Sequence, residues 1–241
     1  MKDLIAKWLP LFFDADDVFE VRGLDVERPG RKMAGFVLSS RIAALASKIA
    51  AIAEKASGTY FTPHRLAADV KTRPLHHLTE VVRTGDDVRP KLTADKDVTG
   101  RRYLIIDVDP VRPAEHKKDS ATDAEKAAAL DVTDRVRRYL AGQGWPAPLV
   151  VDSGNGYHLY YRLADPLPGG EVPDAGADPF AGLLRALKAK FDTANAEVDP
   201  AVFNASRIMK IPGTPARKGT HTTDRPHRTS RVLEIPHDWH R

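Results

Sequence analysis

Apolar and polar positions repeat with two different periods along this chain, and the two periods predict a mixture of strands and helices. Residues 18–38 hold two apolar runs around a Pro-Gly pair, which predicts two strands joined by a turn. Residues 39–56 repeat apolar positions every three or four residues, which predicts a helix capped by Ser39 or Ser40. Residues 59–66 predict a strand that runs into a loop.

The middle of the chain alternates regular and irregular stretches. Residues 67–99 show little periodicity and many charges, so we expect a long connection there. Residues 101–110 form an apolar run that ends in two aspartates, which predicts a buried strand. A helix follows, with Ser120 as its expected cap and Asp123 at the capping-box position.

The last third of the chain continues the alternation. Residues 148–163 predict a strand, a glycine-containing turn and a second strand. Residues 164–178 are rich in Pro, Gly and Asp and predict a loop, and residues 179–194 predict a helix. Further short strands are expected within 207–213 and 231–236. Strands and helices that alternate in this way favour an α/β or α+β fold.

The composition narrows the class of protein. The chain has 241 residues, enough for one large domain or two small ones, and 42% apolar with 29% charged residues is typical of soluble globular proteins. It contains no cysteine, which excludes disulfides, thiolate zinc sites and cysteine nucleophiles and fits a cytoplasmic location. We expect neither a signal peptide nor a membrane span. The net charge of +4 is compatible with nucleic acid as a partner.

The apolar run within 101–110 ends with Asp107 and Asp109. Side chains alternate faces along a strand, so these two carboxylates would share one face and repel each other. A cation between them would offset that repulsion. Asp199 follows the apolar Val198 and adds a third carboxylate, so acids from two segments can hold divalent cations with oxygen ligands. Taken alone, each segment also fits a polar strand end or a turn.

Two further segments carry groups that suit phosphate. Residues 153–158 (SGNGYH) combine His158 with glycines that permit a tight turn and can bring backbone N–H groups close to a phosphate. A later basic segment holds arginines and lysines, which clamp polyphosphate well. These basic residues are Arg207, Lys210, Arg217 and Lys218. An ordinary hairpin and a solvated basic loop are the alternatives. Together with the acids, the segments predict a nucleotidyltransferase that uses two metal ions.

The order of these motifs resembles the archaeo-eukaryotic primase superfamily, and within it the primase-polymerase domains of phage- and plasmid-type replication proteins. LIIDVDP is similar to the acid pair of the first motif, SGNGYHLYY to the second motif with its histidine, and Val198-Asp199 to the third. FNASRIMKIPGTPARKG is similar to the segment after the third motif, where an arginine and a lysine approach the phosphates. The resemblance covers about residues 58–236.

The resemblance implies an α/β (α+β) fold with an N-terminal α/β module, a C-terminal catalytic module related to the RNA-recognition fold, and an active site in the cleft between them. We expect residues 1–57 to supply strands and a helix of the first module and residues 58–241 to form the catalytic core. Two Mg²⁺ or Mn²⁺ ions would be held by Asp107, Asp109 and Asp199.

The implied activity is DNA priming or polymerisation directed by a single-stranded DNA template, with NTP or dNTP as substrate. The implied nucleotide site comprises Ser153, Asn155, Gly156, His158, Arg207, Lys210 and Lys218. The candidate DNA contacts are His64, Arg65, Arg73, Arg217 and Arg228. In many relatives a helical priming module or a helicase follows the catalytic core, and such a partner is expected here.

Other functions would use the same residues. A metal-dependent nuclease or nicking enzyme normally needs a histidine pair or a tyrosine near the metal, and the adjacent pair at 76–77 lies in the weakly patterned region. A non-catalytic single-strand binding module would tolerate the loss of Asp107, although three carboxylates repel a phosphate backbone. A dinucleotide or cyclic-nucleotide synthetase would use a similar metal pair.

Overall fold

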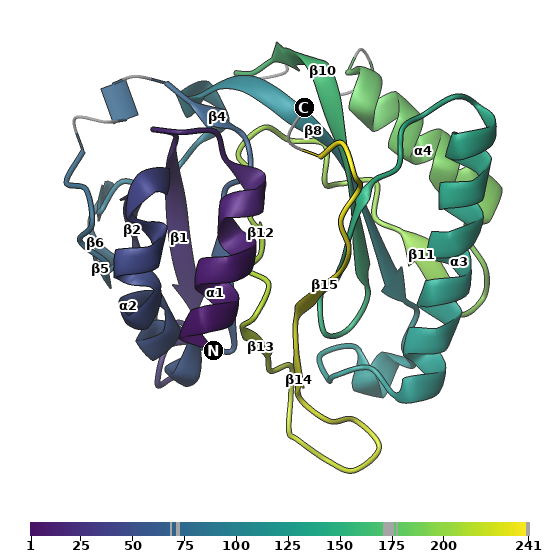
Figure 1. Cartoon of the computed structure of the whole chain (residues 1–241). Coiled ribbons are helices and arrows are strands. Elements are labelled where there is room, and N and C mark those ends of the chain that lie inside the picture. Colours follow the sequence, from purple (N-terminus) through teal and green to yellow (C-terminus); the bar gives the residue numbers. More distant parts are fainter. Residues whose placement is uncertain (68, 71–72, 171–175, 177, 240–241) are drawn as a thin grey trace. The chain divides into compact units, whose positions relative to one another are not determined.

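A computed structural model describes residues 1–67, 69–70, 73–170, 176 and 178–239 and shows helices and strands along the whole of this range (Figure 1). The helices are α1 (Lys2–Trp8), α2 (Ile42–Lys55), α3 (Asp123–Gly142) and α4 (Pro179–Phe191). The strands of the first half are β1 (Val18–Leu24), β2 (Met33–Leu38), β3 (Gly58–Phe61), β4 (Arg65–Leu66), β5 (Thr79–Glu80), β6 (Val82–Thr84), β7 (Asp87–Arg89) and β8 (Val98–Pro110). Those of the second half are β9 (Leu149–Asp152), β10 (Tyr157–Pro168), β11 (Ala196–Val198), β12 (Met209–Lys210), β13 (Pro215–Ala216), β14 (Arg228–Thr229) and β15 (Arg231–Glu234).

The mixed α+β fold class predicted from the sequence is confirmed, and the chain divides into two compact units. The first comprises residues 1–102, 165–171 and 205–215, and the second comprises 103–164, 172–204 and 216–241. The boundary predicted between residues 57 and 58, which would separate part of the N-terminal module from the catalytic core, stays a prediction. None of the helices within the described ranges is long and apolar enough to cross a membrane.

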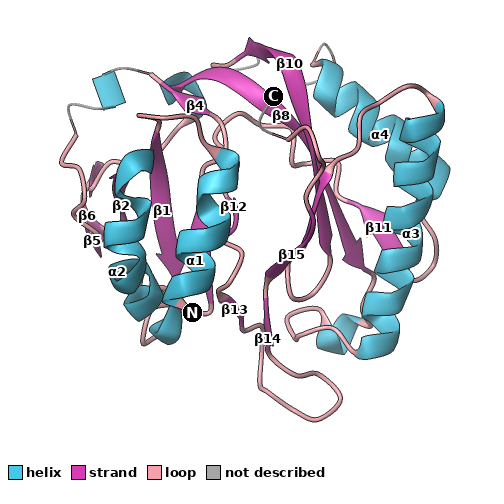
Figure 2. Cartoon of the chain, viewed as in Figure 1, coloured by secondary structure: helices cyan, strands magenta, loops and turns pink. Residues whose placement is uncertain are grey.

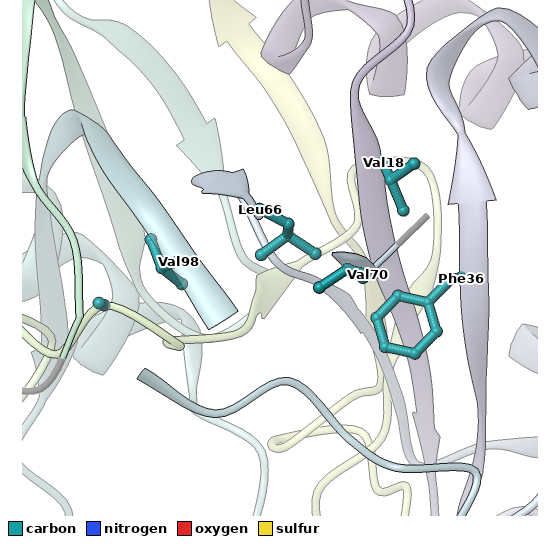
Figure 3. Packing of buried hydrophobic residues seen from close by; sticks show 6 residues of the cluster. Val18, Phe36, Leu66, Val70 and Val98 are labelled. Carbon is teal, nitrogen blue, oxygen red and sulfur yellow. The ribbon is translucent and has the colours of Figure 1, made fainter. Parts of the chain in front are cut away.

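The first unit is built on an antiparallel sheet with the strand order β12-β3-β1-β2-β5. Helices α1 and α2 lie side by side, and α2 packs against β1, β2 and β3 (Figure 1). Buried apolar side chains from distant segments of this unit pack together in one cluster (Figure 3). The cluster contains Val18, Phe36, Leu66, Val70, Val98 and Ala205.

The second unit is built on an antiparallel sheet with the order β11-β8-β10-β9-β15. Figure 2 shows α3 and α4 in cyan beside this sheet, and both helices contact β11. The buried stripe of α3 recurs every three or four residues, as expected for a helix that packs one face on a core. Its members are Lys126, Ala129, Val132, Thr133, Val136 and Leu140.

Two predicted helix caps are wrong. Helix α2 begins at Ile42 after a 3-10 turn at Ser39–Arg41, and Ser39 Oγ donates to the carbonyl of Asp14 instead of capping the helix. Helix α3 is capped by Thr122 and not by Ser120. Thr122 forms a capping box with Glu125, whereas the Ser120 hydroxyl donates to the carbonyl of Lys218.

Other differences concern element lengths. The connection predicted at 67–99 contains the short strands β5, β6 and β7 and the start of β8. Strand β10 continues to Pro168, so the loop predicted at 164–178 begins later, and its residues 171–175 and 177 lie outside the described residues. Helix α4 ends at Phe191, three residues before the predicted end.

Candidate active site

Asp107 and Asp109 lie near the end of β8, and their shared face is confirmed by the burial pattern. Val108 between them is fully buried, whereas both aspartates are partly exposed. The four residues directly before them, 103–106, are buried apolar side chains, which fix this part of the strand in the sheet and leave the two carboxylates next to each other near its end. The sheet therefore holds two acids at adjacent positions of one strand face.

The third predicted acid is tied to the first by a backbone hydrogen bond. Strand β11 pairs with β8, with Val198 opposite Val108. Asp199 follows directly, and its N–H donates to the carbonyl of Asp107 at 2.9 Å. The Asp199 carboxylate accepts a hydrogen bond from the N–H of Ala201 at 2.8 Å. The structure thus brings the Asp199 backbone to Asp107 while its side chain bonds within its own turn.

His158 lies beside the same acid on the neighbouring strand β10. Its Nε2 is 3.5 Å from Oδ1 of Asp107, its Nδ1 is 3.4 Å from the Tyr160 hydroxyl, and the residue is 5% exposed. Burial, and then the nearby Asp107 carboxylate, raise the pKa of Tyr160 well above its usual value. Tyr160 therefore keeps its proton at neutral pH, and its hydroxyl can donate to the histidine ring.

Gly156 brings the turn between β9 and β10 directly against the acids. A Cβ at this position would lie 2.3 Å from the carbonyl oxygen of Val108 and 2.8 Å from Oδ1 of Asp109. Real side chains essentially never approach backbone that closely, so this contact requires glycine. Gly156 was predicted to belong to the nucleotide site, and in the structure it allows the turn to pack closely on β8.

The amides of this turn are largely used within the chain. Ser153 N–H donates to the carbonyl of Gly156, Gly156 N–H donates to Ser153 Oγ, and Gly154 N–H donates to the Asp152 carboxylate. The Asn155 side chain accepts from the N–H of Ala121, which links the turn to the segment before α3. With three of its four amides already donating, the turn resembles a fixed support more than an open phosphate cradle.

The predicted phosphate-binding cations are divided between the two units. Arg207 and Lys210 belong to the first unit and Lys218 to the second. Lys210 is buried, its ammonium donates to the carbonyl of Pro215 and lies 5.3 Å from the centre of the Tyr60 ring.

Lys218 is exposed, and its carbonyl accepts from both the N–H and the hydroxyl of Ser120, which fixes its backbone. The predicted association of Arg207, Lys210 and Lys218 with one triphosphate stays a prediction.

The candidate DNA contacts differ in their surroundings. His64 is 3% exposed, and burial together with Arg101 and Arg102 lowers its pKa to about 3. A buried, neutral ring offers a phosphate neither surface nor charge, which argues against the DNA contact predicted at His64. Arg65 is exposed, with Nη2 3.5 Å from Asp14.

The other three arginines are partly buried. Arg73 bonds Asp97 at 2.8 Å and lies over the Phe36 ring, and Arg228 bonds Asp123 at 2.6 Å. Arg217 is partly buried in the second unit. Among the five candidates, Arg65 therefore presents its guanidinium to solvent most openly.

The donor chemistry at the end of β8 fits a hard divalent cation. Within the described ranges no donor or cation bonds the Asp109 carboxylate, although this group is partly buried beside a second acid. Partly buried carboxylates usually have a partner, and oxygen donors suit Mg²⁺ or Mn²⁺. No group of three or more His, Asp or Glu side chains among the described residues is already gathered closely enough to hold a metal ion. The fit therefore rests on Asp107 and Asp109.

Sequence reasoning missed one ion pair next to the turn between β9 and β10. In this pair, Lys126 of α3 bonds Asp152 at the end of β9. A signal for this pair was present, since Lys126 occupies the buried stripe of an amphipathic helix, where a charge needs a partner.

Comparisons with known proteins give likenesses in solved structures only. No family model matches the chain, and no curated protein matches it. The chain is similar to the crystal structure of primase RepB', with a TM-score of 0.49 and 14% identity over 97% of this chain, and it spans 56% of the length of that protein.

Two further solved structures are similar. One is the catalytic domain of that primase in complex with initiator DNA, with a TM-score of 0.48 and 14% identity over 97% of this chain and 84% of that one. The other is the polymerase domain of Mycobacterium tuberculosis Ligase D in complex with DNA, with a TM-score of 0.48 and 18% identity over 95% and 79%. These are primase and polymerase domains, the class of protein that the sequence motifs resemble. Because the TM-scores are below 0.5, the assignment of function rests on the side chains of this chain.

Proposed function

We propose that this protein is a nucleotidyltransferase that joins nucleotides on a single-stranded DNA template, as a primase-polymerase. The observation that carries the proposal is the pair of partly exposed carboxylates, Asp107 and Asp109, on one face of β8. Asp199, whose N–H donates to the carbonyl of Asp107 and whose carboxylate bonds within its own turn, is the proposed third acid. A fold gains nothing by holding acids together in this way unless a cation joins them, because like charges repel.

His158 is the proposed contact to the nucleotide phosphates. The ring lies beside Asp107, and the protonated Tyr160 hydroxyl next to Nδ1 orients it. A ring held in this way can donate from Nε2 to a phosphate oxygen, where negative charge develops during transfer. Arg207 and Lys218 are the proposed further phosphate contacts, because a guanidinium fork and an ammonium both bind polyphosphate.

Asp107, Asp109 and Asp199 would hold Mg²⁺ or Mn²⁺, since their oxygen donors suit these ions. When bound, such ions activate an attacking hydroxyl and stabilise a leaving pyrophosphate. The chain's own part is to hold the acids at the end of a buried strand and the histidine ring beside them, so that little rearrangement precedes the reaction.

Nucleic acid as the substrate is supported by the net charge of the chain, which is +4. Arg65, with an exposed guanidinium, is the proposed backbone contact in the first unit. Such contacts make binding sensitive to salt, because each neutralised phosphate releases counterions.

Primer extension on a single-stranded DNA template tests the proposal. The wild type is expected to extend a labelled primer with dNTP or NTP in Mg²⁺ or Mn²⁺, with products that match the template and disappear with chelator. The double variant Asp107→Ala, Asp109→Ala is expected to lose activity by about 10³-fold, since it lacks the acids that hold the charge-stabilising ions. Omission of the primer then tests priming.

A charge-matched control is the double variant Asp131→Ala, Asp134→Ala on the exposed side of α3. It changes the net charge by the same amount and should extend primers like the wild type. Shortened oligonucleotides in place of longer ones would instead indicate a nuclease. Intact single-strand binding without extension would indicate a binding module.

A further inference from the structure

Lys126, the buried cation of helix α3, bonds Asp152, the residue that directly precedes the turn between β9 and the strand of His158. Lys126 is 9% exposed, its Nζ is 2.5 Å from Oδ1 of Asp152, and it lies 4.8 Å from the centre of the Tyr157 ring. Burial lowers the pKa of Lys126, and only the bond to Asp152 works against that cost. A charge held at this cost on the apolar face of a helix calls for a reason other than packing.

Asp152 joins three parts of the second unit. Its Oδ1 accepts from Lys126 and also from the N–H of Gly154 at 2.8 Å, and its carbonyl accepts from Ser230 Oγ at 2.7 Å. Arg231 on β15 approaches its other carboxylate oxygen at 3.6 Å. A single carboxylate thus connects the helix, the turn and the last strand of the sheet.

Packing alone does not require this arrangement. A buried ion pair is often replaced by apolar side chains of similar volume without loss of stability, so it is weak support for a fold. Apolar side chains cannot, however, accept the hydrogen bond of the Gly154 amide. That bond fixes a turn whose first glycine has a left-handed φ of +98° and whose second glycine contacts Val108 and Asp109.

The position of this turn determines the geometry of the candidate site at two points. Gly156 packs on β8 beside Asp109. His158 lies two residues after Gly156 and pairs with Val151 across the hairpin. We propose that Asp152, held in place by Lys126, is a positioning residue that fixes the Ser153–Gly156 turn and thereby the distance between His158 and the acids of β8. This inference rests on the proposed nucleotidyltransferase function.

Steady-state primer extension by four variants tests the proposal, at a temperature where each is folded by circular dichroism. Asp152→Ala removes the acceptor for Gly154 and should lower kcat by about 100-fold, the effect of roughly 1 Å of misplacement. Asp152→Asn keeps an oxygen acceptor at the same place and should recover at least a tenth of the wild-type kcat. Lys126→Met should fall between them, because Asp152 keeps its bond to Gly154 but loses its anchor on the helix.

The matched control is Arg137→Met, which removes another ion pair of α3. Arg137 bonds Glu234 of β15 at 2.9 and 2.5 Å, away from the turn. This variant should lose stability and keep the wild-type kcat. Equal kcat in folded Asp152→Ala and wild type, or an equal loss in Arg137→Met, would overturn the proposal. If Asp152→Ala does not fold, the kcat values of Lys126→Met and Asp152→Asn are compared with those of the wild type and Arg137→Met instead.

Hydrogen exchange of the peptide that covers residues 152–158 gives a second reading that needs no catalysis. Exchange should be faster in Lys126→Met and Asp152→Asn than in the wild type, and unchanged in Arg137→Met. An inactive wild type would contradict the proposed function, while the exchange result would still decide whether the pair holds the turn. Unchanged exchange in both variants would contradict the positioning role.

Discussion

Buried charge is treated differently in the interior of the first unit and at the end of β8 in the second. In the first unit, Glu20 is fully buried, and its carboxylate accepts from Arg22 at 2.5 Å and from the N–H of Thr93 at 2.6 Å. Arg102 is equally enclosed and bonds Asp17 at 2.7 Å. Each of these charges meets an opposite charge at hydrogen-bonding distance.

The acids of β8 contrast with these pairs. His158 lies 3.5 Å from Asp107, beyond the distance of a strong charged hydrogen bond, and Asp109 has no bonded donor within the described ranges. Glu20 and Arg102 thus each bond an opposite charge, whereas the Asp109 carboxylate bonds none within the described ranges. Paired charges contribute to the fold, whereas a partly buried acid without a bonded cation is typical of a site that binds one.

The largest expected effect comes from removing one member of a compensated pair. Arg102→Met should lower the free energy of unfolding by about 3 kcal/mol, because it leaves Asp17 without its bonded cation. Asp109→Asn should leave the free energy of unfolding unchanged or raise it, because the substitution relieves repulsion with Asp107 and breaks no bond. Urea unfolding of both variants measures the difference. Equal destabilisation by the two substitutions would remove the contrast between the regions.

Acid should weaken the first unit through His64. The pKa of this buried ring is lowered to about 3 from 6.5, so its contribution to stability is fully present above pH 6.5 and is lost as the pH falls toward 3. Between pH 7 and pH 5 this loss amounts to about 2 kcal/mol. His64→Gln has no titrating ring and should show a flatter dependence in urea unfolding at the two pH values. Parallel curves for variant and wild type would show that the ring does not titrate in this way.

The strand that holds the acids could be predicted because its signals are local. The apolar run before Asp107 identifies a buried strand, and alternation puts Asp107 and Asp109 on one face whatever the rest of the fold does. The turn after β9 was also readable, since two glycines around Asn155 permit only a few backbone shapes. Element type therefore followed from short-range patterns.

What could not be predicted depends on contacts between distant segments. Ser120 is as good a cap as Thr122 by residue type, but its hydroxyl is used by the carbonyl of Lys218, almost a hundred residues away. His64 was a predicted DNA contact, but the fold buries its ring near Arg101 and Arg102. Gly156 gave no sign that it would contact Asp109. Such roles depend on which segments meet, and the sequence pattern does not contain that information.

A smaller effect should appear when a divalent cation is added. If Asp107 and Asp109 bind Mn²⁺, the ion stabilises the folded state, and a concentration ten times the dissociation constant corresponds to about 1.4 kcal/mol. The midpoint of thermal unfolding should rise with Mn²⁺ in the wild type and return with chelator. Asp109→Asn should abolish the rise, whereas Asp131→Asn on the exposed side of α3 should retain it. A rise that persists in Asp109→Asn would assign the ion to another site.

The smallest expected effect on stability concerns Arg65, which shares Asp14 with Arg102 at 3.5 Å but is 52% exposed at its side chain. An exposed pair of this kind is worth less than about 1 kcal/mol, so Arg65→Met should unfold nearly like the wild type, in contrast to Arg102→Met. Its effect should appear in binding instead. If Arg65 contacts a phosphate, the variant should bind single-stranded DNA more weakly, and the slope of log affinity against log salt concentration should decrease by about one. Fluorescence anisotropy over a series of salt concentrations measures that slope. An unchanged slope would leave Arg65 as a surface residue with no part in binding DNA.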